Sequence, residues 1–173
     1  MAIVFELVIH FDRDGEEVRD AVMSLIRYPP IVADRQGVPL HSPQVQSLSS
    51  GRVELSVVPV GVSHANGMDG AVRGFGLSSD GYSDLGHGLF AILARLKGYR
   101  SAFVGWDPEP ILDEADPGEP ATETGWLAQI EAGYLKGLVF SEEVQREFSL
   151  YSEKLVPFAP GYVWVSYQGE PKK

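Results

Sequence analysis

The stretch DLGHGLFAILARLKGYRSAFVGW, Asp84–Trp106, contains the clearest helix of the chain, followed directly by a strand. Large aliphatic residues recur at helical spacing in its first two thirds: Leu85, Leu89, Ile92, Leu93 and Leu96. Such a stripe is typical of a helix that buries one face. We expect Asp84 to cap this helix and Gly98 to end it. Tyr99–Trp106 is predicted to be a strand.

The sequence before this helix predicts two further strands and another helix. Alternating apolar residues from Ala2 to Phe11 indicate a first strand, and Glu16–Arg27 has helical spacing. The helix is expected to stop at Pro29, because proline lacks the backbone N–H that a helix needs. Val53–Val60 is predicted to be a second strand. The region between, residues 31–50, is expected to be a loop that contains an irregular strand.

Turn residues then predict a hairpin. Asn66-Gly67 and Asp69-Gly70 are typical of turns that join antiparallel strands, and Ala71–Leu77 is predicted to be the returning strand. The predicted order in residues 1–106 is therefore strand, helix, strand, strand, helix, strand. This order indicates an α+β fold with a ferredoxin-like βαββαβ layer, in which the sheet is largely antiparallel. Because many functions share this topology, it does not predict any one of them.

The length of 173 residues fits a single domain. Within residues 1–173, we expect a βαββαβ core over 1–106, an acidic, proline-rich loop over 107–123 and an extension over 124–173. The extension is predicted to contain two helices and a strand. The strand is Gly161–Gln168, and the second helix is capped by Ser141. The first helix has an apolar stripe of Trp126, Leu127, Ile130 and Tyr134, and the second has one of Val144, Phe148, Tyr151 and Leu155.

Charge is concentrated in one window of the chain. Between Arg100 and Lys136 there is no Lys or Arg, but there are eight carboxylates: Asp107, Glu109, Asp113, Glu114, Asp116, Glu119, Glu123 and Glu131. This window supplies most of the net charge of -10, because the remaining 16 acidic and 14 basic residues nearly cancel. A dense carboxylate cluster repels itself within a Debye length of about 8 Å, and a cation, a metal or a basic protein would relieve that repulsion. The alternative is that the segment is a solvated surface loop.

Composition excludes several classes of function. Without cysteine, the chain has no disulfide, zinc-thiolate site, iron-sulfur cluster or thiol nucleophile. The pI of about 4.8 and the scattered basic residues argue against direct nucleic-acid binding. Apolar runs are too short to span a membrane, and a cytoplasmic location is expected.

Two sequence patterns suggest ligand sites, but neither has the required chemistry. Gly81 and Gly86 have the spacing of a phosphate-binding loop, yet His87 and Gly88 stand where Lys and Ser or Thr are required. We therefore expect these glycines to allow close packing. The acidic loop lacks the ligand spacing of a calcium-binding loop. We predict no cofactor and no metal.

The preferred hypothesis is a non-enzymatic acidic protein that binds and neutralises a basic protein partner, such as a toxin or a nuclease. In being small, acidic and free of catalytic motifs, the chain resembles bacterial inhibitors and immunity proteins. The expected contact residues combine the acidic loop with its flanking tryptophans: Trp106, Asp107, Glu109, Asp113, Glu114, Asp116, Glu119, Glu123 and Trp126. Aromatic residues beside a charged rim are typical of an interface hot spot.

The alternative is a small hydrolase that uses His64 or His87. Histidine is the general acid-base side chain that titrates near neutral pH, and Asp69, Asp80 and Asp84 are the nearby carboxylates that could assist it or hold a metal. His64 shares a loop with Ser63, but spacing within a loop does not establish a catalytic triad. His10, on the first strand, is expected to be structural. A third possibility is a structural or regulatory module of a larger assembly.

Overall fold

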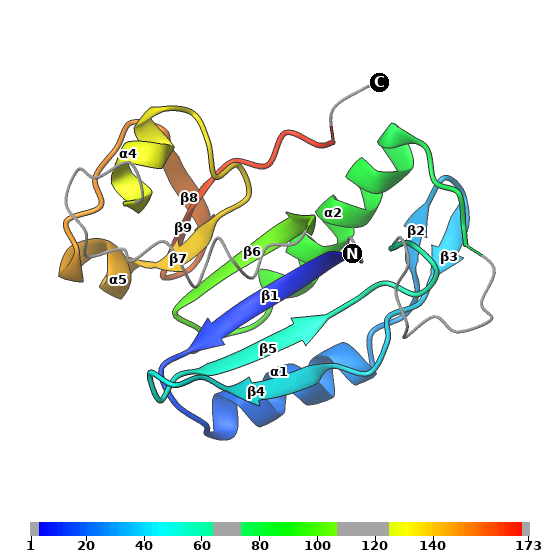
Figure 1. The fold of residues 1–173 in the computed structure, drawn as a ribbon, viewed down its shortest axis with the longest axis horizontal. Coiled ribbons are helices and arrows are strands. Elements are labelled where there is room, and N and C mark those ends of the chain that lie inside the picture. Colours follow the sequence, from blue (N-terminus) through cyan, green and yellow to red (C-terminus); the bar gives the residue numbers. More distant parts are fainter. Residues whose placement is uncertain (1–3, 64–73, 107–124, 171–173) are drawn as a thin grey trace.

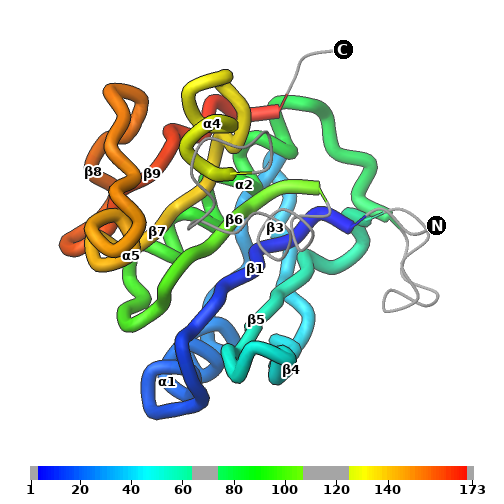
Figure 2. Tube along the Cα trace, turned by 60° about the vertical axis from the view of Figure 1, so that its left-hand side comes forward, coloured from blue at the N-terminus to red at the C-terminus, as the bar shows by residue number. Residues whose placement is uncertain are grey.

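The computed structural model describes residues 4–63, 74–106 and 125–170, which form an α+β fold around a large antiparallel sheet. Figures 1 and 2 show this sheet from two directions, with β1 lying between β5 and β6. The order of its seven strands is β4-β5-β1-β6-β7-β9-β8, and every neighbouring pair is antiparallel. The strands are β1 (Phe5–Phe11), β4 (Gln44–Ser47), β5 (Val53–Val57), β6 (Ser101–Trp106), β7 (Val139–Ser141), β8 (Leu155–Ala159) and β9 (Tyr162–Val165).

A separate two-stranded hairpin and four helices complete the described residues. The hairpin consists of β2 (Ile31–Ala33) and β3 (Gln36–Val38). The helices are α1 (Glu16–Ile26), α2 (Ser79–Leu93), α4 (Trp126–Glu131) and α5 (Glu142–Glu147). Because β6 pairs with β7, the sheet continues from the predicted core into the predicted C-terminal extension.

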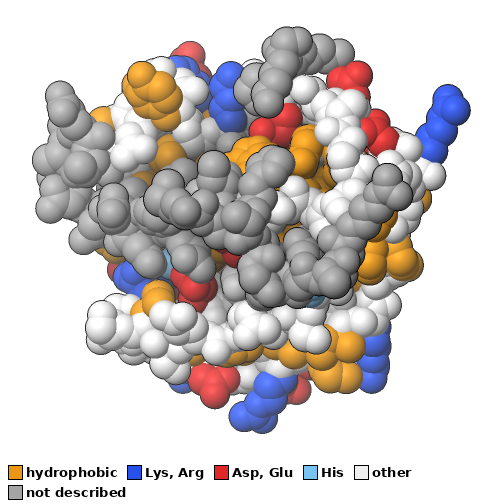
Figure 3. Space-filling view, turned by 45° about the vertical axis from the view of Figure 1, so that its right-hand side comes forward, with side chains coloured by type: hydrophobic (Ala, Val, Ile, Leu, Met, Phe, Trp, Pro, Cys, Tyr) orange, Lys and Arg blue, Asp and Glu red, His pale blue; other side chains and the backbone are white. Residues whose placement is uncertain are grey.

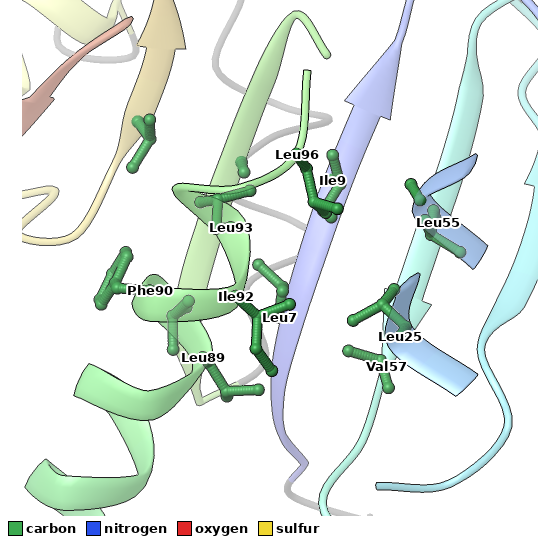
Figure 4. Close-up of a cluster of buried hydrophobic side chains, with 14 of the residues drawn as sticks. Leu7, Ile9, Leu25, Leu55, Val57, Leu89, Phe90, Ile92, Leu93 and Leu96 are labelled. Atoms are coloured by element: carbon green, nitrogen blue, oxygen red, sulfur yellow. The ribbon is translucent and has the colours of Figure 1, made fainter. Parts of the chain in front are cut away.

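The main core lies between one face of the sheet and the helices α1 and α2. Figure 4 shows Leu25 of α1 beside Leu55 and Val57 of β5, and side chains of α2 beside those of β1. The predicted stripe is buried: Leu85, Leu89, Ile92 and Leu93 lie on α2, and Leu96 is buried just after it. Burial of these side chains removes apolar surface from water, which is the dominant favourable term in folding. The predicted end at Gly98 is wrong, because α2 ends at Leu93 with Ala94 as its C-cap.

A second core lies on the opposite face of the sheet. There Val8 of β1 and Phe103 of β6 pack with residues of α4 and α5, among them Trp126, Ile130 and Val144. The sheet is therefore covered by helices on both faces, by α1 and α2 on one side and by the two short C-terminal helices on the other. Ser141 caps α5 as predicted, its hydroxyl accepting a hydrogen bond from the Val144 N–H at 3.2 Å.

Helix α2 begins earlier than the sequence predicts. Ser78, not Asp84, is its N-cap, and the Ser78 hydroxyl accepts a hydrogen bond from the Gly81 N–H at 3.0 Å. The carboxylate of Asp34 in turn accepts bonds from the Ser78 N–H at 2.6 Å and the Ser78 hydroxyl at 2.7 Å. Both hydrogen bonds from Ser78 lower the pKa of Asp34, and the bond from the backbone N–H has the larger effect. The cap itself is local, whereas the Asp34 carboxylate that supports it comes from the remote turn between β2 and β3.

The glycines that resemble a phosphate-binding loop lie inside α2, where neighbouring side chains approach the helix backbone. A Cβ added at Gly81 would lie 2.3 Å from the Asp34 carboxylate, and one at Gly86 would lie 2.6 Å from the Tyr167 hydroxyl. At Gly88 it would lie 2.3 Å from the Ile31 methyl carbon Cγ2. The sequence suggests that these glycines let a backbone segment pass closely, whereas the atoms that approach the helix here belong to side chains.

We predict that Gly88→Ala destabilises the protein despite the higher helix propensity of alanine. Alanine gains about 1 kcal/mol of propensity, whereas overpacking against Ile31 costs about 1–3 kcal/mol. In an Ile31→Ala background, which removes the obstructing Cγ2, the same change should be neutral or stabilising. Chemical denaturation of the wild type, of Gly88→Ala, of Ile31→Ala and of the double variant measures this coupling. Equal losses in both backgrounds would contradict the packing role of Gly88.

The predicted strand over Ala71–Leu77 is wrong where the structure describes it. Residues 74–77 form no strand, and residues 71–73 lie outside the described residues, as do the turn residues at 66–70. Gly76 has φ +58, which interrupts an extended backbone. The partner of β5 is instead β4, from the region predicted to be a loop with an irregular strand.

The C-terminal helices are shorter than the sequence predicts. Tyr134 and Tyr151, which were expected to lie on the buried faces of α4 and α5, are 67% and 62% exposed. Both helices end before these residues, so the helical spacing no longer applies to them. The last strand, β9, lies within the predicted range, and β8 occupies residues that the sequence assigned to the end of a helix.

Candidate binding site

A cavity of about 500 Å³ lies where the end of β6 meets the segment Tyr167–Glu170. Trp106, the last residue of β6, lines it together with Phe103 and Gly105, and Lys136 also lines it. The cavity therefore brings together residues from β6 and from two positions in the C-terminal part of the chain. Figure 3 shows one face of the molecule, on which acidic and hydrophobic side chains lie side by side.

Glu170 is held in this cavity by three hydrogen bonds, two that its carboxylate accepts and one that its backbone N–H donates. Its Oε2 accepts a bond from the Trp106 indole Nε1–H at 3.2 Å, and its Oε1 accepts one from the Tyr167 hydroxyl at 2.9 Å. The backbone N–H of Glu170 donates to the Ser83 hydroxyl on α2 at 2.9 Å. These bonds fix both the chain and the side chain, so the carboxylate is pre-positioned.

Tyr167 acts as a donor to Glu170 at all ordinary pH values. Burial raises the pKa of Tyr167, and the hydrogen bond to the Glu170 carboxylate and its negative charge raise it further. The centroid of the Tyr167 ring lies 5.1 Å from that of His87, with the two rings edge to face, and 5.2 Å from that of Phe90. The hydroxyl is therefore protonated and its orientation is set by the packing of its ring.

Aromatic packing also fixes the ring of Trp106. Its centroid lies 5.2 Å from that of Phe5, with the two planes at 71°, and 5.2 Å from that of Tyr82. Offset and edge-to-face contacts of this kind contribute about 0.5–1.5 kcal/mol beyond the area that they bury. The half-buried indole therefore forms a firm wall of the cavity.

Within the described part of the chain, the Glu170 carboxylate takes part in no ion pair. Among the described residues, no Lys, Arg or His side chain lies within ion-pair distance of its carboxylate. Lys136, which lines the same cavity, instead donates from Nζ to the Gln168 Oε1 at 2.9 Å. The two donors to the Glu170 carboxylate are both neutral groups, an indole N–H and a phenol hydroxyl.

The two tryptophans predicted as contact residues have different environments. Trp106 lies in the cavity, whereas Trp126 is 2% exposed and packs with Phe140 at 5.8 Å in the second core. The Trp126 side chain thus contributes to the core, because it has almost no exposed surface. The predicted acidic contacts lie outside the described residues: Asp107, Glu109, Asp113, Glu114, Asp116, Glu119 and Glu123.

Glu170 and Tyr167 escaped the sequence analysis because their partners are remote in the chain. Trp106 and Ser83 precede Glu170 by 64 and 87 residues. A single Glu after the last predicted strand carries no local signal of a site. The one available clue was the predicted contact residue Trp106, which the fold places beside them.

Of the two histidines that the sequence suggested for catalysis, the structure describes only His87. His87 is exposed on α2, as its position away from the leucine stripe predicts, while His64 and Asp69 lie outside the described residues. No group of three or more His, Asp or Glu side chains in the described ranges is placed to hold a metal ion.

His10 is buried and forms part of a polar row across three strands. It faces Glu54 on β5 and Ser101 on β6 in the strand register. The Nε2 of His10 lies 3.1 Å from the Oε2 of Glu54. The His10 side chain is 3% exposed and the Glu54 side chain 7%. A Ser–His–Glu row has the residue types of a nucleophilic triad. Ser101 is only 2% exposed, however, so a substrate cannot reach its hydroxyl in this structure.

Each helix in the described ranges is too short or too polar to cross a bilayer. Comparison of the chain with protein-family models, with curated proteins and with solved structures finds no match. The site must therefore be interpreted from its own residues.

Proposed function

We propose that this chain is a non-enzymatic, cytoplasmic acidic binding protein that neutralises a basic protein partner, in the manner of an inhibitor or immunity protein. The observation that carries the proposal is the unneutralised Glu170 carboxylate, pre-positioned in an aromatic cavity at the end of β6. A fixed, uncompensated negative charge beside an indole ring is suited to a cationic group.

The sequence that follows Trp106 adds long-range attraction to this local site. Residues 107–123 contain seven carboxylates and no Lys or Arg. Such a segment raises the rate of encounter with a basic protein, and this effect weakens as ionic strength rises. Buried contacts, in contrast, mainly determine how slowly the complex dissociates.

We predict that neutralising Asp113, Glu114 and Asp116 together slows association with the partner that co-purifies from the native host. Replacement by Asn, Gln and Asn should reduce the association rate about tenfold at low salt and flatten its salt dependence, with a smaller change in dissociation. Stopped-flow kinetics across a salt series measures both effects.

The matched control neutralises three exposed acids elsewhere, Asp14→Asn, Asp20→Asn and Glu153→Gln, for the same change in net charge. This variant should retain most of the association rate and its salt slope, because steering depends on where the charge lies. Equal effects of the two triple variants would contradict a local role of the acidic segment. An unchanged rate in the first variant would contradict steering by this segment altogether.

We further infer that residues 5–106 form a variant of the ferredoxin-like layer. Two observations support this: the chain order β1, α1, β4, β5, α2, β6 and the neighbour order β4-β5-β1-β6 with antiparallel pairing. Here β4 would take the place that the sequence assigned to residues 71–77, and the β2–β3 hairpin would be an insertion after α1. An experimental structure in which β1 does not lie between β5 and β6 would contradict this inference.

A further inference from the structure

We propose that the cavity between Trp106 and Glu170 binds the guanidinium group of an arginine side chain. That this arginine belongs to a protein partner rests on the proposed function. The preference for a guanidinium rests on the cavity itself, on its charge, its hydrogen-bonding capacity and its aromatic wall.

The hydrogen bonds of Glu170 leave room for a bidentate cation. Each carboxylate oxygen offers two lone-pair sites, and each accepts one bond within the described residues, from Trp106 or from Tyr167. One acceptor site therefore remains on each oxygen. A guanidinium donates two parallel N–H bonds to both oxygens of a carboxylate, whereas an ammonium acts as a point charge.

The aromatic wall favours the same group. A guanidinium is planar and weakly hydrated, so it stacks on an indole face at a lower desolvation cost than an ammonium. Trp106 is held by Phe5 and Tyr82 and by its bond to Glu170, so little conformational entropy is lost on binding. The cavity volume of about 500 Å³ lies in the range of small-ligand sites.

Lys136 supplies an internal test of the sign of the ligand's charge. Its exposed ammonium lines the cavity and is bound to Gln168 rather than to Glu170. It should repel a cationic ligand and attract an anionic one. Removing its charge must therefore strengthen arginine binding, and it would weaken the binding of a carboxylate or phosphate.

The experiment titrates the full chain with the peptide acetyl-Gly-Arg-Gly-amide and with the matched peptide that contains citrulline. Citrulline has nearly the same shape as arginine but no charge. We expect the indole N–H signal of Trp106, identified by its loss in Trp106→Phe, to shift saturably with the arginine peptide. The citrulline peptide should bind at least about fivefold more weakly, the factor that corresponds to a cation–π contact. Equal affinities for the two peptides would overturn the proposal.

Two variants test the assigned residues. Glu170→Gln keeps an acceptor oxygen but removes the charge, and it should abolish the preference for arginine over citrulline. Lys136→Gln should increase affinity for the arginine peptide about twofold, because one exposed repulsive charge is lost. Loss of arginine binding in Lys136→Gln would overturn the proposal, because removing a repulsive charge cannot weaken the binding of a cation to this cavity. If Glu170→Gln lowers the melting temperature strongly, the Lys136 variant and the two peptides decide the question.

Failure of this inference differs measurably from failure of the proposed function. If the arginine peptide does not bind but the partner still associates in a salt-dependent way through the acidic segment, the cavity proposal alone is wrong. If the arginine peptide binds but the co-purified partner is acidic or its association is insensitive to salt, the proposed function is wrong and the guanidinium site stands.

Discussion

Replacing Leu93 with alanine should lower the free energy of unfolding by about 2–5 kcal/mol, one of the largest effects that we expect from a single substitution. Leu93 is fully buried on α2 and belongs to the main core. The loss combines the transfer free energy of the deleted methyl groups with the cost of the cavity that they leave. The midpoint of urea denaturation should fall while its slope stays the same.

Asp84→Ala on the same helix is the matched control. Asp84 is exposed and lies inside α2 rather than at its start. We expect a change within about 0.5 kcal/mol for an exposed surface position of this kind. If Asp84 were the N-cap, the loss would be about 1 kcal/mol. Unchanged stability in Leu93→Ala would show that α2 does not present its stripe to the core.

The sequence predicts those parts of the fold whose signals are local. The stripe from Leu85 to Leu96 shows the buried face of α2 because its period is that of the helix itself. The alternation in β1 and the cap of α5 at Ser141 are local in the same way. Signals of this kind depend on a few neighbouring residues, and no tertiary contact is needed to interpret them.

Features that depend on remote contacts were missed. The turn between β2 and β3 uses Asp34 and Arg35 at positive φ, without the Asn-Gly or Asp-Gly pair that indicates such a turn. The apolar alternation of Phe75 and Leu77 correctly indicates packing on the core, but these residues pair with no strand in the described structure. Alternation reports burial of one face, and it does not by itself report strand pairing.

The candidate site was predictable only in part for the same reason. Trp106 stands out in the sequence because it precedes the acidic segment. Glu170 becomes notable only when the sheet places the end of β6 beside the residues that follow β9. In the proposed function, the net charge predicts the sign of the partner's charge, whereas the geometry of the cavity predicts the shape of the group that it would bind.

Replacing His10 with alanine should cost about 3–5 kcal/mol of stability, because it removes the imidazole that pairs with a buried carboxylate. His10 and Glu54 lie on adjacent strands near the centre of the sheet, and both side chains are nearly inaccessible to water. Removing the imidazole takes away its 3.1 Å hydrogen bond to the buried Glu54 side chain, and a buried polar group that loses its partner costs more than the pair itself contributes. Thermal and chemical denaturation measure the loss.

Two further variants separate the loss of this partner from simple loss of packing. Glu54→Gln keeps an oxygen that can accept a bond from His10 at 3.1 Å but carries no charge, so it should cost less than His10→Ala. The double variant His10→Leu, Glu54→Leu removes both polar groups at once. Its loss should be smaller than that of His10→Ala alone, because apolar replacements of a buried pair are often neutral or stabilising. If His10→Ala costs only about 1 kcal/mol, the Glu54 carboxylate must gain water or another donor in the variant. If the double variant is the least stable of the three, packing rather than charge determines the role of this pair.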